Sequence, residues 1–179
     1  MLDNQIIALV KSVVEAQEAT ATIPGVVIKQ AFQPTQQGVN TAPTGYMFKV
    51  GDHRLGTPER SDVYDTNSST IIHTETQQYE TMFQMSALST QDPSNTSQYT
   101  SSDILNYIAY CLQSNYAIET FTANGIGIYN VPDVRNPYFM DDRERHQASP
   151  SFDFTIVHKQ IITSTSNVVQ SVNFSFDTV

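Results

Sequence analysis

Histidine, cysteine and carboxylate side chains are the groups of this 179-residue chain that could bind a metal or act as catalysts. The four histidines, His53, His73, His146 and His158, are scattered along the chain. None of them forms the H-x-x-x-H spacing that is typical of zinc sites. The single cysteine, Cys111, falls on the apolar side of a predicted helix, where a buried, inert thiol is expected. No G-x-S-x-G nucleophile motif occurs. The sequence therefore predicts no metal site, no cofactor and no covalent nucleophile.

The only closely spaced glycine pair is Gly125-Ile126-Gly127. It precedes a predicted strand, whereas a glycine-rich phosphate site opens onto the N-terminus of a helix. We therefore interpret this pair as a tight turn that leads into the strand.

Charged residues cluster in two runs, within residues 53–62 and 141–145. Adjacent acids on a loop do not make an acid–base pair, because that pair needs separated carboxyl groups in different environments. Each run is either a solvated loop or a charged contact between subunits, since opposed charges set register and partner choice at interfaces. The candidate contact residues are Arg54, Glu59, Arg60, Asp62, Asp141, Asp142, Arg143, Glu144 and Arg145. We expect no enzyme.

The composition is polar but weakly charged. Ser, Thr, Asn and Gln make up 63 residues, charged residues only 15% and aromatic residues 10%, and the net charge is −9. The aromatic content argues against intrinsic disorder. The negative charge argues against a protein that holds nucleic acid by neutralising phosphates.

Nothing in the sequence predicts a membrane or secreted protein. No apolar stretch approaches the roughly 18 residues of a transmembrane helix. The start, Met1 to Asn4, lacks the positive charge that opens a signal peptide. A lone cysteine forms no intramolecular disulfide. We expect a soluble protein that is made in the cytoplasm.

The first half of the chain predicts one helix and three strands. Asp3 or Asn4 suits an N-cap, and apolar residues recur at helical spacing over residues 3–18. Alternating or β-branched residues predict strands at 26–32, 46–50 and 71–88. The last of these exceeds the ordinary strand length, so we expect it to bend or to project beyond the sheet.

Two polar segments, residues 33–45 and 51–69, are predicted loops. The second contains Gly51, Gly56 and Pro58 and few apolar residues. Its 19 residues exceed the usual connection length. It is therefore either a functional loop or a sign that the neighbouring elements are wrongly assigned.

The second half predicts one more helix and three more strands. Thr100 and Asp103 form a capping box for a helix that extends to about Asn115. The other predicted elements are a turn at 91–95, strands at 126–131, 152–156 and 168–176, a charged loop at 132–149 and a hairpin turn at 163–167. The whole order predicts an α+β fold over residues 1–179, a single domain with a mostly antiparallel β-sheet and two helices packed on one face.

Several segments carry a resemblance by their order and spacing. A leading helix and a long polar strand are followed by a helix that opens on Ser102-Asp103-Ile104-Leu105-Asn106-Tyr107. Next come a strand at Asn124-Gly125-Ile126-Gly127-Ile128, the segment Val134-Arg135-Asn136, a charged loop, and Ser151-Phe152-Asp153-Phe154-Thr155. Over residues 5–177 this order resembles the neck or tail-terminator proteins of long-tailed bacteriophages, particularly the contractile-tailed ones.

The resemblance implies a structural role in the virion, at the neck of the tail. Proteins of this kind have an α+β fold and form a ring, usually a hexamer. The ring caps the tail tube, ends tube and sheath growth, and joins the tail to the connector of the head. DNA passes through its central hole, and no catalytic or cofactor-binding residues are implied. The implied partners are the tail tube protein, the connector or adaptor proteins and the tail sheath.

Two observations bear on this role independently of the resemblance. Long polar loops and many uncharged polar residues suit wide, wet contacts with neighbours. An acidic surface around a channel repels phosphates, so that DNA slides through without specific binding.

Other functions fit the same residues. One is another virion subunit, either of the tail tube or of head completion. The other is a small non-catalytic binding module outside the virion, in which Phe174 and Phe176 form an exposed grip rather than part of a core strand.

Overall fold

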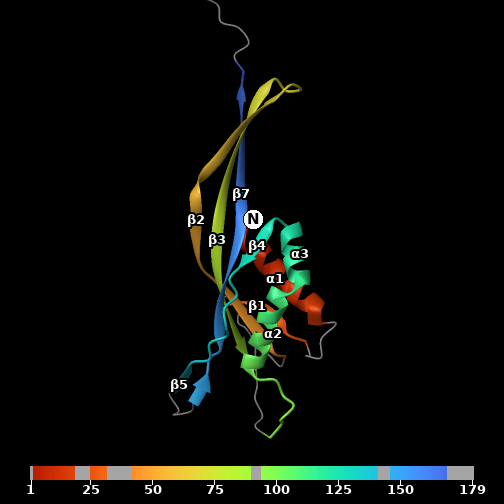
Figure 1. The fold of residues 1–179 in the computed structure, drawn as a ribbon, viewed down its shortest axis with the longest axis vertical. Helices are drawn as coiled ribbons and strands as arrows, with labels where there is room; N and C mark the ends of the chain where they lie inside the picture. The colour runs from red at the N-terminus through yellow and green to blue at the C-terminus, as the bar shows by residue number, and fades with distance from the viewer. Residues whose placement is uncertain (1, 19–24, 32–41, 90–93, 141–145, 169–179) are drawn as a thin grey trace, which may run out of the picture.

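The computed structural model describes residues 2–18, 25–31, 42–89, 94–140 and 146–168, and packs three helices on one face of a five-stranded sheet (Figure 1). The helices are α1 (Asp3–Glu18), α2 (Ser101–Gln113) and α3 (Asn115–Ala123). The strands are β1 (Val27–Gln30), β2 (Thr44–Asp65), β3 (Thr70–Leu88), β4 (Ile126–Tyr129), β5 (Tyr138–Met140), β6 (His146–Ala148) and β7 (Ser151–Asn167). The predicted α+β class is confirmed, although the helices number three rather than two.

The strand order in the main sheet is β1-β2-β3-β7-β4. Only β1 and β2 are parallel, and every other neighbouring pair in the sheet is antiparallel, as predicted. Strands β5 and β6 form a separate antiparallel pair within residues 132–149, which the sequence predicted as a loop. Strand β7 pairs along its whole length with the central strand β3, from Ser151 opposite Ser86 to Asn167 opposite Thr70.

The core lies between the helices and one face of this sheet. Alternate residues of the strands face apolar residues of the helices such as Ile6 and Ile108, and among them Phe83, Phe152 and Phe154 are at most 1% exposed. The rings of Phe83 and Phe154 stack across β3 and β7 with their centroids 5.8 Å apart. Apolar burial of this kind is the main stabilising contribution to such a fold.

The predicted loop at residues 51–69 is wrong, because β2 continues through it to Asp65 and only residues 66–69 form a turn. Two irregularities in the pairing with β3 accommodate its glycines and proline. The register shifts between Lys49 and Gly51, and again between Leu55 and Glu59, the stretch that contains Gly56 and Pro58. β-bulges tolerate these residue types, which normally end a strand.

The predicted hairpin turn at 163–167 is also wrong. Strand β7 pairs with β3 residue by residue from Ser151 to Asn167. The Ser and Thr residues of this segment resemble a turn in composition, but Thr is β-branched and favours extended backbone. The predicted strand at 168–176, with Phe174 and Phe176, lies outside the described residues apart from Val168.

The predicted second helix ends at Gln113, close to its expected end, and a third helix that the sequence did not predict, α3, follows after Ser114. This residue ends α2, and its hydroxyl then caps α3 by accepting a hydrogen bond from the backbone N–H of Ala117 at 3.1 Å. The predicted capping box at the start of α2 is confirmed, since Thr100 and Asp103 satisfy each other's backbone N–H groups. Gly125 has a positive φ of 69° in the turn before β4, which confirms the tight turn predicted there.

Candidate assembly surface

Nearly half of the sheet extends beyond the helices as a three-stranded projection (Figure 1). We call this projection the arm. It consists of residues 53–65 of β2, 70–80 of β3 and 159–167 of β7, joined at its tip by the turn at 66–69. The long β3 strand was expected to bend or to project beyond the sheet. Instead β2 and β7 pair with it throughout the arm, so that the sheet itself extends beyond the helices. No residue of the arm belongs to the buried apolar core.

Four of the predicted contact residues lie on β2 in the arm. Arg54, Arg60 and Asp62 pair with alternate residues of β3 and so share one face of the sheet, whereas Glu59 lies on the other face. All four are exposed to solvent. The structure thus gathers on one strand the charged residues that the sequence placed in a loop.

Two of these charged residues already have partners within the arm. The Arg60 guanidinium lies 3.1 Å from the Glu75 carboxylate. The Asp62 carboxylate lies 2.7 Å from His73 Nδ1, and the other ring nitrogen of His73 lies 2.8 Å from the Ser166 hydroxyl. The second pair therefore links all three strands of the arm near its tip. The remaining predicted contact residues, Asp141 to Arg145, lie outside the described residues.

The base of the arm is fastened to the first turn of α1 by a lysine. Lys49 Nζ donates to both carboxylate oxygens of Asp3, at 3.0 and 2.9 Å, and also pairs with Asp52. Burial alone lowers the pKa of Lys49, but these bonds outweigh burial and raise it. Burial alone raises the pKa of Asp52, and hydrogen bonds from Lys49 and Thr81 reverse that effect and lower it. Helix α1 is thus tied to β2 beside the bulge at which the arm begins.

A buried histidine completes this junction. His158 is 7% exposed, and its ring stacks on Tyr79 with a centroid distance of 5.7 Å. The Thr81 hydroxyl donates to Asp52 at 2.7 Å, so it accepts from Nε2–H of His158 at 3.0 Å. Nδ1 of His158 is buried without a partner among the described residues. Burial lowers the pKa of His158 although Asp52 and Asp3 oppose that effect, so the fold favours the neutral ring.

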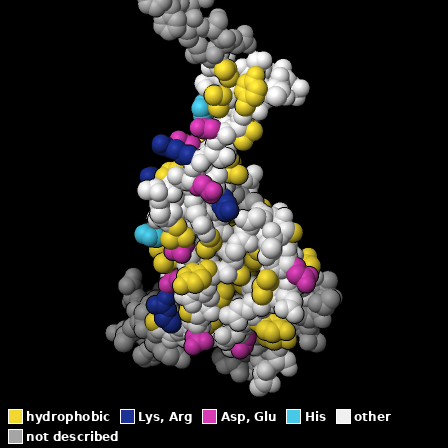
Figure 2. Space-filling view, turned by 45° about the horizontal axis from the view of Figure 1, so that its top comes forward, with side chains coloured by type: hydrophobic (Ala, Val, Ile, Leu, Met, Phe, Trp, Pro, Cys, Tyr) yellow, Lys and Arg dark blue, Asp and Glu magenta, His cyan; other side chains and the backbone are white. Residues whose placement is uncertain are grey.

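Apolar side chains are exposed along the arm (Figure 2). Val63 and Tyr64 of β2 are 58% and 54% exposed, and Ile161 and Ile162 of β7 are 61% and 60% exposed. The arm therefore carries apolar surface that no described residue of its own chain covers. Exposed apolar surface of this kind marks contacts with other molecules.

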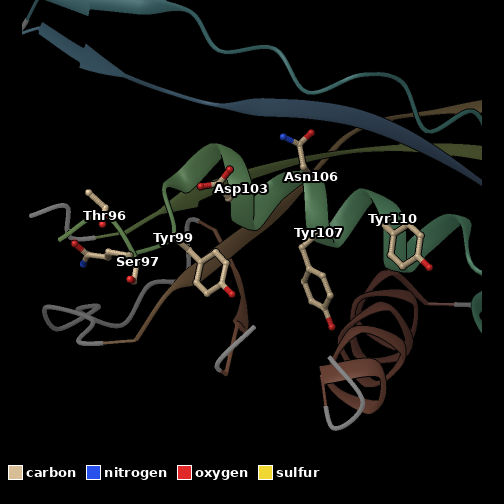
Figure 3. Close-up of a pocket in the computed structure, with 8 residues that line it drawn as sticks. Thr96, Ser97, Tyr99, Asp103, Asn106, Tyr107 and Tyr110 are labelled. Carbon is tan, nitrogen blue, oxygen red and sulfur yellow. The ribbon is translucent and has the colours of Figure 1, made fainter. Parts of the chain in front are cut away.

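A second exposed surface lies beside α2, on the body of the protein. Tyr99, Tyr107 and Tyr110 line a shallow groove of about 680 Å³ together with Asp103 and Asn106 (Figure 3). The carboxylate of Asp103 is already engaged in the capping box with Thr100.

The described residues contain no obvious reactive centre. No group of three His, Cys, Asp or Glu side chains within them is placed to hold a metal ion. Cys111 is buried in α2 as predicted, and burial raises the pKa of its thiol, which keeps it protonated and unreactive. None of the helices in this part of the chain is long and apolar enough to cross a membrane.

The family of the chain follows from a comparison with protein-family models. The model described as E217 gateway protein gp29 matches residues 5–168. The chain belongs to this family. The matched segment of this gateway-family chain contains nearly all of α1, every strand, α2 and α3, and therefore includes the arm. No curated protein matches the chain.

The family match supports the predicted structural role in the virion. The family is one of phage gateway, or neck-type, proteins, which places the chain among structural proteins of the head–tail junction in the virion. Such a structural family is typically non-catalytic. The match indicates interaction with other head or tail proteins of the phage.

Sequence reasoning missed the arm and its exposed apolar side chains. The signal was present in Gln160 to Asn167, an uncharged run of β-branched and polar residues without Gly or Pro. Read by β-propensity alone, this run continues the strand before it.

Proposed function

We propose that this protein forms a hexameric ring at the neck of a contractile phage tail. The ring caps the tail tube, ends tail polymerisation and joins the tail to the head connector. The arm is the observation that carries this proposal, because it offers exposed strands and apolar side chains outside the core of the chain. A subunit that leaves such surface uncovered is suited to assembly with further copies or with stacked partners.

The charge distribution supports the passage of DNA through the ring. No Lys or Arg occurs between Arg60 and Arg135, whereas this stretch contains eight acidic residues. A protein with so few cations over α2, α3, β3 and β4 offers little charge for neutralising phosphates. DNA therefore passes along the channel without specific binding.

The two charged runs that the sequence analysis singled out remain our candidates for subunit contacts. In the arm they are Arg54, Glu59, Arg60 and Asp62, and in the other run Asp141 to Arg145. Reversing Arg143 and Arg145 to Glu weakens assembly more than folding if this second run lies in an interface. Assembly equal to wild type would remove these two residues from the contact set.

Native mass spectrometry of the purified full-length protein, together with electron microscopy, tests the ring. We expect a mass of six subunits and single closed rings, either in solution or when the protein is mixed with tails. Long stacked tubes would instead indicate the tail tube role, the second candidate within the virion. Absence of the protein from purified virions would contradict every virion role and favour a binding module outside the particle.

A further inference from the structure

The outer edge of β7 in the arm is an unprotected strand edge. Strand β4 pairs with β7 only at residues 155–158, and among the described residues no strand pairs with the outer edge of residues 159–167. The segment Gln160 to Asn167 contains no charge, no proline and no glycine, and its pairing with β3 has no bulge. Proteins normally protect an exposed edge with one of these devices, because an open edge pairs with other chains.

The opposite edge of the arm, on β2, is different. It is interrupted by the register shift between Leu55 and Glu59, where Gly56 has a φ of +64°. From Glu59 to Asp65 the pairing with β3 is regular again, so this stretch presents a straight edge that no described strand covers. Within the part of the chain that the structure describes, the arm therefore has two unpaired edges, one on β7 and one on the outer part of β2.

We propose that residues 160–167 of β7 pair with residues 60–65 of β2 in a second copy of this chain. This inference rests on the proposed function and supplies the contact that would close the ring. Strands β2 and β7 both run antiparallel to β3 and so run in the same direction. A second copy rotated about an axis along the arm places its β2 beside β7 as a parallel strand.

The contact joins two different edges, so every copy keeps one edge free for the next. Such heterologous contacts repeat from copy to copy and close into a ring when the rotation allows it. The arms then form one continuous sheet in which no edge stays open. The β7 edge is then no longer available for aggregation by pairing with other chains.

The side chains beside the two edges suit this pairing on both faces of the sheet. At equal height along the arm, Val63 of one copy lies beside Thr165 of the next and Tyr64 beside Ser166, because each pair is level with the same residue of β3. The isoleucines lie four residues further from the tip. Ile161 and Val63 share one face of the sheet, and Ile162 and Tyr64 share the other. All four are more than half exposed in the single chain. Aromatic and β-branched side chains on neighbouring strands stabilise a sheet by packing across the pair.

The charges of the β2 edge do not oppose the contact with an uncharged strand. Arg60 pairs with Glu75 and Asp62 pairs with His73 inside the same arm. The approaching β7 therefore meets charges that already have partners, and it needs no charged residue of its own. This match favours a second copy of the chain over a charged partner.

Pairs of introduced cysteines test the contact in the full-length protein. Ser61→Cys is combined in turn with Ile161→Cys, Thr163→Cys and Thr165→Cys, which lie on the same face and sample three registers. Within one chain β3 separates these positions by two strand spacings, about 9.5 Å, beyond the roughly 7 Å reach of a disulfide. Any new disulfide therefore joins two copies, since the native Cys111 is buried.

Oxidation followed by denaturing electrophoresis under non-reducing conditions gives the result. We expect at least one pair to give a ladder of dimers, trimers and larger species, whereas each single cysteine variant gives no ladder. The variants must melt like the wild type when reduced, which shows that they fold. A dimer formed by Thr163→Cys alone would show that two β7 edges pair with each other and would overturn the proposal.

The mass of the wild-type protein separates failure of the contact from failure of the ring. If wild type forms rings but no cysteine pair crosslinks, this contact is wrong while the proposed function stands. If wild type is monomeric at every concentration and on tails, the ring itself is wrong. If crosslinks form only after residues 169–179 are deleted, the occupant of the edge is the chain's own C-terminal segment, and the proposal is overturned.

Discussion

At the residue scale, the junction between body and arm contains a buried titratable group. His158 is buried, donates through Nε2 to Thr81 and stacks on Tyr79. A positive charge on this ring would need a partner for Nδ1, and no described residue supplies one. Protonation of His158 therefore opposes the native packing at the base of the arm.

This constraint predicts a pH dependence of stability. The pKa of His158 lies below its ordinary value of about 6.5 in the folded chain, so the unfolded chain binds a proton that the folded chain does not. The free energy of unfolding therefore falls as the pH is lowered from about 7 towards 5. In His158→Gln this fall is smaller, as measured by urea unfolding at several pH values.

The difference between wild type and this variant isolates His158, because the other titrating groups are shared. Glu18 acts in the opposite sense as its carboxyl ionises above about 4.5, since burial raises its pKa. The Asp52 carboxyl, with its lowered pKa, contributes only at more acidic pH. Parallel stability curves for the two proteins would contradict the role given to His158.

Two isoleucines of β7 allow a comparison between an apolar side chain that stabilises the fold and one that is available for assembly. Ile156 is fully buried under the helices, whereas Ile162 is 60% exposed on the arm. We expect Ile156→Ala to lower the free energy of unfolding by about 2–5 kcal/mol. Ile162→Ala should change it by less than about 0.5 kcal/mol.

Urea unfolding of dilute protein, at a concentration where mass measurement shows monomers, checks both values. Dilution matters because assembly itself stabilises the folded state. At assembly concentrations Ile162→Ala instead weakens the oligomer if its side chain is covered by a second copy. Equal losses in the two dilute variants would show that the arm contributes to the core of its own chain.

At the element scale, local patterns predicted the elements whose signals are local. The apolar period of α1, the cap of α2 and the alternation of β3 each lie within a few residues, and each prediction is confirmed. The continuation of β2 through Gly56 and Pro58 depends on pairing with β3, and a single segment does not contain that information. The uncharged end of β7 was assigned to a turn because of its Ser and Thr content, although its β-branched residues already favour extended backbone.

The same reasoning explains what the sequence showed of the candidate surface. The contact residues of β2 were predicted as contacts from their charge alone, and their arrangement on one strand required the structure. The open edges and the exposed apolar side chains of the arm were missed, because exposure depends on where the helices stop covering the sheet (Figure 1). The ring contacts stay a prediction.

The cap of α2 gives a prediction that belongs to one element. The Thr100 hydroxyl accepts from the backbone N–H of Asp103 at 3.2 Å, and the Asp103 carboxylate accepts from the backbone N–H of Thr100 at 2.9 Å. Thr100→Ala removes the first bond and should lower the free energy of unfolding by about 1 kcal/mol. The control is Thr122→Ala, an exposed position inside α3, for which we expect no loss.

Urea unfolding followed by circular dichroism compares the two threonine variants. The core residues Ile104 and Leu105 follow the cap directly and are fully buried, so fraying of the first turn disturbs the packing of α2 on the sheet. Equal stability of Thr100→Ala and wild type would show that the capping box contributes nothing beyond what water supplies.

At the scale of the whole molecule, the chain consists of a body that contains the buried core and an exposed arm that does not. Every residue of the buried apolar core lies outside the arm. The two parts share strands β2, β3 and β7 and meet at the junction of Lys49, Asp52 and His158. This separation predicts that the arm is removable without loss of the fold.

An armless variant tests that separation directly. Leu55 and Gln78 are paired across β2 and β3, so residues 56–77 are replaced by an Asn-Gly turn and the chain is ended after Lys159. We expect this variant to keep the helical circular dichroism signal and a cooperative unfolding transition, because its core is unchanged. In native mass spectrometry it should be monomeric where the full-length protein assembles, because both free edges are gone. A variant that keeps its helical structure and still assembles would place the contacts on the body, and the tyrosine groove beside α2 would be the first surface to mutate. An unfolded variant would show that the arm supports the core.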